Sequence, residues 1–121
     1  MPPIVLIVED DPGTLHLFEL VVKREGYSAH CAINGDEAIA FLQQNVPDVV
    51  LLDLGLPGPG GAEILQFIQQ TPALARTKTI VISAYTDLIR EISHYDVAAV
   101  HIKPIKATRL LQSIKAALGD E

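Results

Sequence analysis

Four apolar residues at positions 49–52 constrain the fold of this chain most, because they end at Asp53 and give way to a glycine- and proline-rich stretch. A short apolar run containing β-branched residues is typical of a strand buried on both faces of a parallel sheet. The stretch 55–61 holds four glycines and two prolines, which predicts a loop. Ligands of open α/β sheets bind beyond the carboxyl ends of the strands. Asp53 is therefore a candidate site residue, the alternative being that it only caps the following turn.

Similar runs along the chain predict the rest of the fold. Apolar runs recur at residues 4–8, 79–82 and 97–102, and a less apolar run at 27–32 is expected near an edge of the sheet. Helical patterns separate these strands, at residues 12–24, 36–44, 62–70, 87–94 and 108–118. Five alternations of strand and helix predict an α/β fold with a doubly wound, five-stranded parallel sheet and helices on both faces. The length of 121 residues suits a single domain over residues 1–121.

Composition narrows the classes of partner and compartment. A formal net charge of −6 disfavours nucleic acid and anionic membrane surfaces as partners. One cysteine excludes an intramolecular disulfide, and Cys31 is expected to be a small core residue. No apolar run approaches the ~20 residues of a membrane-spanning helix, and no leader precedes the first predicted strand. We therefore expect a cytoplasmic protein.

Polar residues stand at the ends of four predicted strands: Glu9 and Asp10, Asp53, Ser83 and Lys103. Parallel strands share a carboxyl edge, so these side chains are expected to meet in one crevice. Gathered carboxylates repel one another unless a cation neutralises them, and hard oxygen ligands suit Mg²⁺. A lysine and a hydroxyl suit the oxygens of a phosphoryl group. Together the residues predict phosphoryl transfer onto a carboxylate, with Asp53, at the end of the middle strand, as the nucleophile.

Each of these residues also has a purely structural interpretation. Acids before a helix are favoured by its dipole, and Asp11 is expected to act as an N-cap in this way. Ser83 could bond its own backbone, and Lys103 could be a solvated lysine at a strand end.

At this point the pattern resembles the receiver domain of two-component response regulators. Residues 8–12, Val-Glu-Asp-Asp-Pro, resemble the acidic pair after that family's first strand, and residues 52–58 resemble its phosphoacceptor loop. Ser83-Ala84 resembles the hydroxyl and small-residue pair, and Lys103-Pro104 the lysine followed by a proline that is usually cis. The resemblance covers the chain from Ile4 to Leu118.

The resemblance implies a flavodoxin-like fold and a phosphoryl group on Asp53, donated by a histidine kinase or phosphotransferase. It implies that Lys103 pairs with that group and that Ser83 hydrogen-bonds it. The implied ligands of Mg²⁺ are Asp10, Asp53, the carbonyl of Gly55 and, through water, Glu9. Such a domain is a signalling switch rather than an enzyme, with self-catalysed phosphoryl uptake and slow autodephosphorylation. Its implied partners are the phosphodonor protein and a downstream protein or output domain, with a homodimer as a further candidate.

Departures from the family pattern keep a second function open. Val100 stands where receiver domains usually carry a tyrosine or phenylalanine that changes rotamer on phosphorylation. Tyr85 is our candidate to replace that aromatic residue as a reporter or lid. Gly55 places no side chain near the phosphoryl group, so we expect water access to differ from that in relatives with a larger residue there. The segment 83–103 is also shorter than is usual. The alternative is therefore a receiver-like docking module that does not switch.

Two further functions fit the sequence less well. A hydrolase of the aspartyl-phosphate type would want a second acid two residues after Asp53, where Gly55 stands. A flavodoxin-like flavin binder would need a phosphate-binding loop after its first strand, and this chain has acids there.

Overall fold

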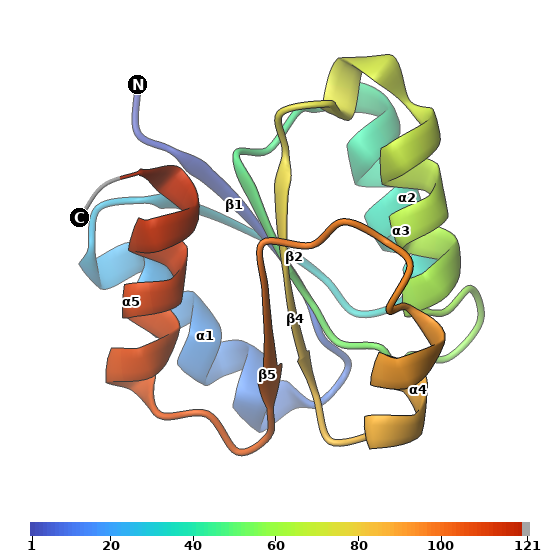
Figure 1. Ribbon diagram of the computed structural model, residues 1–121. Coiled ribbons are helices and arrows are strands. Elements are labelled where there is room, and N and C mark those ends of the chain that lie inside the picture. The colour runs from blue at the N-terminus through green and yellow to red at the C-terminus, as the bar shows by residue number, and fades with distance from the viewer. Residues whose placement is uncertain (120–121) are drawn as a thin grey trace.

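A five-stranded parallel sheet with the strand order β2-β1-β3-β4-β5 runs through the centre of the computed structural model, which describes residues 1–119 (Figure 1). The strands are β1 (Ile4–Val8), β2 (Ser28–Ala32), β3 (Val49–Leu52), β4 (Lys78–Ser83) and β5 (Ala99–Ile102). The helices are α1 (Pro12–Arg24), α2 (Gly35–Gln44), α3 (Gly61–Gln70), α4 (Thr86–Glu91) and α5 (Ala107–Leu118), with a 3₁₀ turn, η1 (Pro72–Leu74). This strand order is that of flavodoxin-like proteins, so the predicted fold is confirmed.

The strands are apolar throughout because their side chains alternate between two helical layers. Along β1, Val5 and Ile7 pack into the core under α1 and α5, whereas Leu6 and Val8 pack into the core under α2 and α3. Figure 1 shows α1 and α5 together on one side of the sheet and α2 and α3 on the other. β3 lies in the middle of the order and all four of its residues are buried. Because neither face of β3 meets solvent, the residue at its end is held between two packed layers.

Helix α1 begins as its sequence predicts. The carboxylate of Asp11 accepts a hydrogen bond from the backbone N–H of Thr14 at 2.9 Å, and Pro12 follows as the first helical residue. This confirms Asp11 as an N-cap. The helix thus starts three residues beyond Glu9 and leaves the acids before it at the edge of the sheet.

Three local expectations were wrong. Cys31 is exposed rather than buried, because β2 is an edge strand and pairs only with β1. Helix α4 ends at Glu91 instead of reaching residue 94, since the chain turns at Ile92 and buries that side chain in the layer of α2 and α3. β5 begins at Ala99 rather than at residue 97. Two residues of β5, Val100 and Ile102, are 41% and 59% exposed.

No helix within residues 1–119 has the length and apolar character needed to cross a bilayer.

Two glycines let helices pack closely against the loop between β3 and α3. A Cβ atom on Gly35 would overlap the carbonyl oxygen of Pro59, and its distance to the Pro59 carbonyl carbon would be only 2.8 Å. A Cβ on Gly61 would lie 2.9 Å from the Cα of Leu54. Real Cβ atoms do not come this close to backbone atoms, so the path of the loop after Asp53 depends on both glycines.

Replacing Gly35 with alanine is expected to lower the free energy of unfolding by about 1–3 kcal/mol, the usual effect of overpacking. Urea unfolding of the variant measures this loss. Gly13→Ala is the matched control, because the nearest neighbour of its Cβ would be 3.6 Å away and alanine favours a helix by up to about 1 kcal/mol over glycine. Equal midpoints for Gly35→Ala and the wild type would contradict the close packing of α2 on this loop.

Candidate functional site

Strand register places the first two acids side by side. Val8 is aligned with Leu52 across the pair β1 and β3, so the following residues, Glu9 and Asp53, are neighbours at the carboxyl edge of the sheet. The backbone N–H of Asp53 continues the ladder by donating to the carbonyl of Val8 at 3.0 Å. Both carboxylates are nearly removed from solvent, with Glu9 1% and Asp53 5% exposed. Two buried acids in contact need a compensating positive charge.

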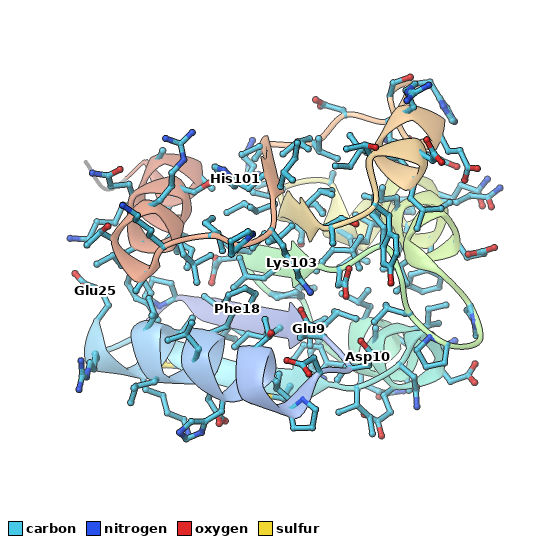
Figure 2. The ribbon with its side chains drawn as sticks, turned by 90° about the horizontal axis from the view of Figure 1, so that it is seen from below. Glu9, Asp10, Phe18, Glu25, His101 and Lys103 are labelled. Atoms are coloured by element: carbon cyan, nitrogen blue, oxygen red, sulfur yellow. The ribbon has the colours of Figure 1, made fainter. Side chains whose placement is uncertain are left out.

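Lys103 supplies that charge from the far edge of the sheet. Its backbone N–H donates to the carbonyl of Ser83 at 3.0 Å, which extends β5 along β4. Its side chain then crosses the end of β4, and Nζ donates to Glu9 Oε1 at 2.6 Å and to Asp53 Oδ2 at 3.2 Å. Figure 2 shows Lys103 beside Glu9 and Asp10, whereas Glu25 lies at the opposite end of α1. One ammonium group therefore joins the ends of three strands.

The pKa directions follow from burial and from this contact. Burial raises the pKa of the Glu9 carboxyl above its ordinary value and outweighs the opposing hydrogen bonds from Lys103 and from the backbone of Asp11. Burial also acts to lower the pKa of the Lys103 ammonium, but its hydrogen bond to Glu9 and the charge of Asp53 outweigh burial and raise that pKa. Lys103 is therefore held in its charged form between the two carboxylates. The Glu9 carboxyl group is more easily protonated than that of a free glutamate.

Three acids form a ligand set suited to a divalent cation. Glu9, Asp10 and Asp53 each offer a carboxylate oxygen, and these oxygens lie within 4.8 Å of one another. No other group of three such ligating side chains occurs among residues 1–119. Asp10 is exposed whereas Glu9 and Asp53 are buried, so the cluster opens to solvent on the side of Asp10. All-oxygen ligands with access to water suit Mg²⁺.

The remaining predicted residues, Ser83 and Gly55, line the same edge. Ser83 is fully buried at the end of β4, and its Oγ accepts a hydrogen bond from the backbone N–H of Tyr85 at 3.1 Å. The hydroxyl proton of Ser83 remains able to point to a ligand, since a hydroxyl donates once and accepts twice. The backbone N–H of Gly55 donates to Asp53 Oδ1 at 3.2 Å, which orients the carboxylate. The peptide bond between Lys103 and Pro104 is cis.

The structure therefore brings all six predicted residues to one edge, although their chemical roles stay predictions. What the sequence analysis missed is the direct bond between Lys103 and Glu9, which lie 94 positions apart. The sequence instead predicted that Lys103 contacts a phosphoryl group and that Glu9 contacts a cation through water. No local sequence signal links the two residues, since their contact depends on the register of four neighbouring strands.

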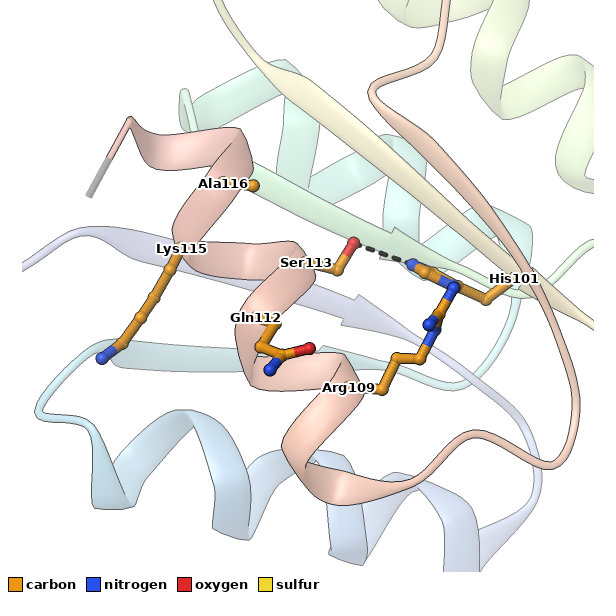
Figure 3. A pocket seen from close by; sticks show the side chains of 6 residues that line it. All are labelled: His101, Arg109, Gln112, Ser113, Lys115 and Ala116. Atoms are coloured by element: carbon orange, nitrogen blue, oxygen red, sulfur yellow. Dashed lines mark hydrogen bonds between the residues drawn. The ribbon is translucent and has the colours of Figure 1, made fainter. Parts of the chain in front are cut away.

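A pocket lies away from the acids, between β5 and α5, and is lined by residues that include His101, Arg109 and Ser113 (Figure 3). Within it, His101 Nε2 and Ser113 Oγ are 2.8 Å apart and share a hydrogen bond. Burial, helped by the positive charge of Arg109, lowers the pKa of the His101 imidazole. None of the strand-end acids lines this pocket, so we assign it to the packing of α5 on the sheet.

Comparisons with known proteins match nearly the whole chain. The family model for the response regulator receiver domain matches residues 5–115. A curated relative, the polar-differentiation response regulator DivK of Brucella anthropi, is 31% identical, with 99% of each chain covered. Among solved structures, a CheY-like receiver domain protein from Methanospirillum hungatei JF-1 has a TM-score of 0.89 and is 25% identical. The match covers 99% of this chain and 96% of the chain in that structure.

A second solved structure shares the fold at lower identity. It is the receiver domain of a sensor histidine kinase from Pseudomonas aeruginosa PAO1, with a TM-score of 0.90, 22% identity, and coverage of 98% of this chain and 99% of its own. That protein was crystallised with a magnesium ion coordinated in its active-site cleft.

The raised pKa of Glu9 predicts how stability responds to its replacement. A raised pKa in the folded chain contributes stability that is complete below the ordinary pKa of glutamate and is lost as the pH rises through the raised value. Glu9→Gln, a neutral side chain of the same shape, should therefore raise the free energy of unfolding near neutral pH. The gain should vanish as the pH falls below about 4. Urea midpoints without divalent cations measure both effects.

Glu91→Gln is the charge-matched control, because Glu91 is exposed and stands outside the cluster. A Glu9→Gln variant less stable than the wild type near neutral pH would contradict the unfavourable burial of the Glu9 carboxylate.

Proposed function

This chain belongs to the response regulator receiver family, and from that premise we propose that Asp53 is the carboxylate that accepts a phosphoryl group in two-component signalling. The observation that carries the proposal is the double contact of Lys103 Nζ, at 2.6 Å from Glu9 and 3.2 Å from Asp53. A fixed ammonium group beside a buried carboxylate is suited to receive an incoming dianionic group, since it offers charge neutralisation without reorganisation.

The phosphodonor is a phosphohistidine on a histidine kinase or on a phosphotransferase protein. An oxygen of Asp53 bonds to phosphorus, and the bond from phosphorus to the histidine nitrogen breaks in line with it. The histidine nitrogen keeps the electron pair and takes up a proton. Gly55 N–H and Lys103 hold the two carboxylate oxygens of Asp53 before the reaction, so the nucleophile is oriented. This orientation is what a receiver contributes to phosphoryl transfer.

The acid cluster fits Mg²⁺ as the resident cation. Asp10 and Asp53 would hold it directly, together with the carbonyl of Gly55, while Glu9 would act through water. When bound, Mg²⁺ neutralises negative charge on the transferring group. The fit rests on three carboxylate oxygens within 4.8 Å of one another, at an edge where Lys103 alone cannot balance three acids.

Ser83 has a positioning role in the same scheme. Its oxygen already accepts from Tyr85 N–H, so its own proton is free to be donated to a phosphoryl oxygen. Phosphorylation would then favour one arrangement of the loop after β4, and the domain acts as a switch through that shift in population. The partners we propose are the phosphodonor protein and, on the output side, a downstream protein or output domain, in the cytoplasm. A second copy of the chain is a further candidate.

The alternative of a docking module that does not switch is less well supported. It draws on Val100, an exposed residue at the position of the usual aromatic switch residue. Against it stands the site itself, since the lysine contacts both buried acids. A chain that had lost phosphorylation would have no reason to keep this unfavourable cluster of charges.

Treatment with acetyl phosphate and Mg²⁺ is expected to add one phosphoryl group to the wild type and none to Asp53→Asn. Intact-mass spectrometry measures the adduct directly. Chelation of Mg²⁺ should abolish uptake by the wild type, because the acids at the edge are then left without their cation.

Asp11→Asn is the matched control, since Asp11 is a neighbouring exposed acid that caps α1 and asparagine caps a helix equally well. It should take up the phosphoryl group like the wild type. An adduct on Asp53→Asn, or none on the wild type, would refute Asp53 as the acceptor.

A further inference from the structure

A pocket of about 320 Å³ lies at the amino edge of the sheet, the end opposite to the acids. Its lining includes Leu65 and Ile68 of α3, Leu74 of η1, Thr79 near the start of β4, and Asp96 before β5. We call it the amino-edge pocket. Its volume falls at the lower end of the range for small-molecule sites, about 300–1,000 Å³. None of its described lining residues belongs to the site proposed for phosphoryl transfer.

Thr79 brings a buried hydroxyl to this pocket. Because side chains alternate along a strand, Thr79 faces the same layer as Val81, which packs with α2 and α3. The residue is only 4% exposed, and within residues 1–119 its hydroxyl has no hydrogen-bond partner. Buried hydroxyl groups normally have such a partner, since burial without one is unfavourable. A molecule bound in the amino-edge pocket would supply it.

Asp96 gives the pocket its charge. The segment that carries Asp96 is held beside β4, because the backbone N–H of Ala98 donates to the carbonyl of Thr79 at 2.8 Å. Asp96 is exposed, and its carboxylate has no hydrogen-bond or ion-pair partner in the described part of the chain. Among the described residues that line the pocket, Asp96 alone is charged. The pocket therefore carries one negative charge that is not paired.

Two further hydroxyl groups of the lining have already used their protons. Thr71 Oγ1 donates to the carbonyl of Phe67 at 2.6 Å, and Thr77 Oγ1 donates to the carbonyl of Pro47 at 2.7 Å. Each oxygen can then accept a hydrogen bond but cannot donate one. Together with a carboxylate, these oxygens favour a ligand that is positively charged and donates hydrogen bonds. They disfavour an anion.

The basic residues that are closest in sequence do not reverse this charge. Lys78 precedes Thr79, so its side chain leaves the other face of the sheet, where it lines a pocket with Ser113 of α5. Arg76 is exposed and is not among the described residues that line the amino-edge pocket.

We propose that the amino-edge pocket binds a small organic cation, in which an ammonium or guanidinium group is attached to an apolar body. The N–H groups of the ligand donate to the carboxylate of Asp96 and to the hydroxyl oxygen of Thr79. The apolar body packs against Leu65, Ile68 and Leu74. This site is separate from the proposed phosphoryl site, since it lies at the other end of the sheet and shares no residue with it.

The test is an NMR titration of the whole chain with probes of similar size and different charge. Butylammonium and butylguanidinium should shift the backbone amide signals of Thr79 and Asp96 and reach saturation, with dissociation constants on the order of 1 mM for ligands this small. 1-Pentanol, which is neutral, should bind at least about threefold more weakly. Pentanoate, an anion, should cause no saturable shift. Excess Mg²⁺ keeps the cations from the acids at the carboxyl edge.

Two variants remove the groups that recognise the ligand. Asp96→Asn should weaken butylammonium binding by about three- to tenfold, because the charge of the acceptor is lost. Thr79→Val has the same shape without the hydroxyl and should weaken it by at least about threefold. Asp87→Asn is the charge-matched control, since Asp87 is an exposed acid of α4 outside the pocket. It should bind butylammonium like the wild type.

Several results would overturn the proposal. One is the absence of saturable shifts with either cation, and another is binding of pentanoate as tight as that of butylammonium. Unchanged butylammonium affinity in Asp96→Asn or in Thr79→Val would also refute the assigned contacts. Shifts confined to the amide signals of Glu9, Asp10 and Asp53 would show that the probe binds only at the acids.

Discussion

The contact of one ammonium group with two buried carboxylates is the interaction on which the rest of the site depends. Glu9 and Asp53 are nearly removed from water, and burial of like charges is unfavourable unless a cation stands between them. Lys103 provides that cation only because β5 is aligned with β4 and its side chain crosses the end of that strand. The sheet therefore holds together charged side chains that would otherwise separate.

This arrangement also explains why the loops around the site are built from small residues. The chain after Asp53 must stay close to α2 and α3, and Gly35 and Gly61 allow that approach. Gly55 serves a different purpose, since the atom that its Cβ would overlap belongs to Tyr85 on another loop. The glycine-rich segment is thus packed on several sides, and its backbone is positioned by contacts rather than by its own stiffness.

The sequence predicted the fold well because its signals are local. The apolar runs, the N-cap Asp11 and the loop after Asp53 each follow from neighbouring residues, and the shared carboxyl edge of parallel strands follows from their alternation with helices. It predicted less well what depends on distant neighbours. Cys31 is exposed because β2 lies at an edge, α4 ends early because Ile92 turns inward, and the bond between Lys103 and Glu9 follows from register across the sheet. None of these can be read from a single segment.

The most direct test of the account is a crystal structure grown with Mg²⁺ and beryllofluoride, a mimic of a phosphoryl group. We expect a beryllofluoride adduct on Asp53. Lys103 and Ser83 should donate hydrogen bonds to its fluorine atoms, and the cation should lie beside Asp10 and Asp53. Lys103 should by then have exchanged its bond to Asp53 for one to the adduct. An adduct on another residue, or a cation bound away from the three acids, would contradict the claim that these strand ends form one phosphoryl-accepting site.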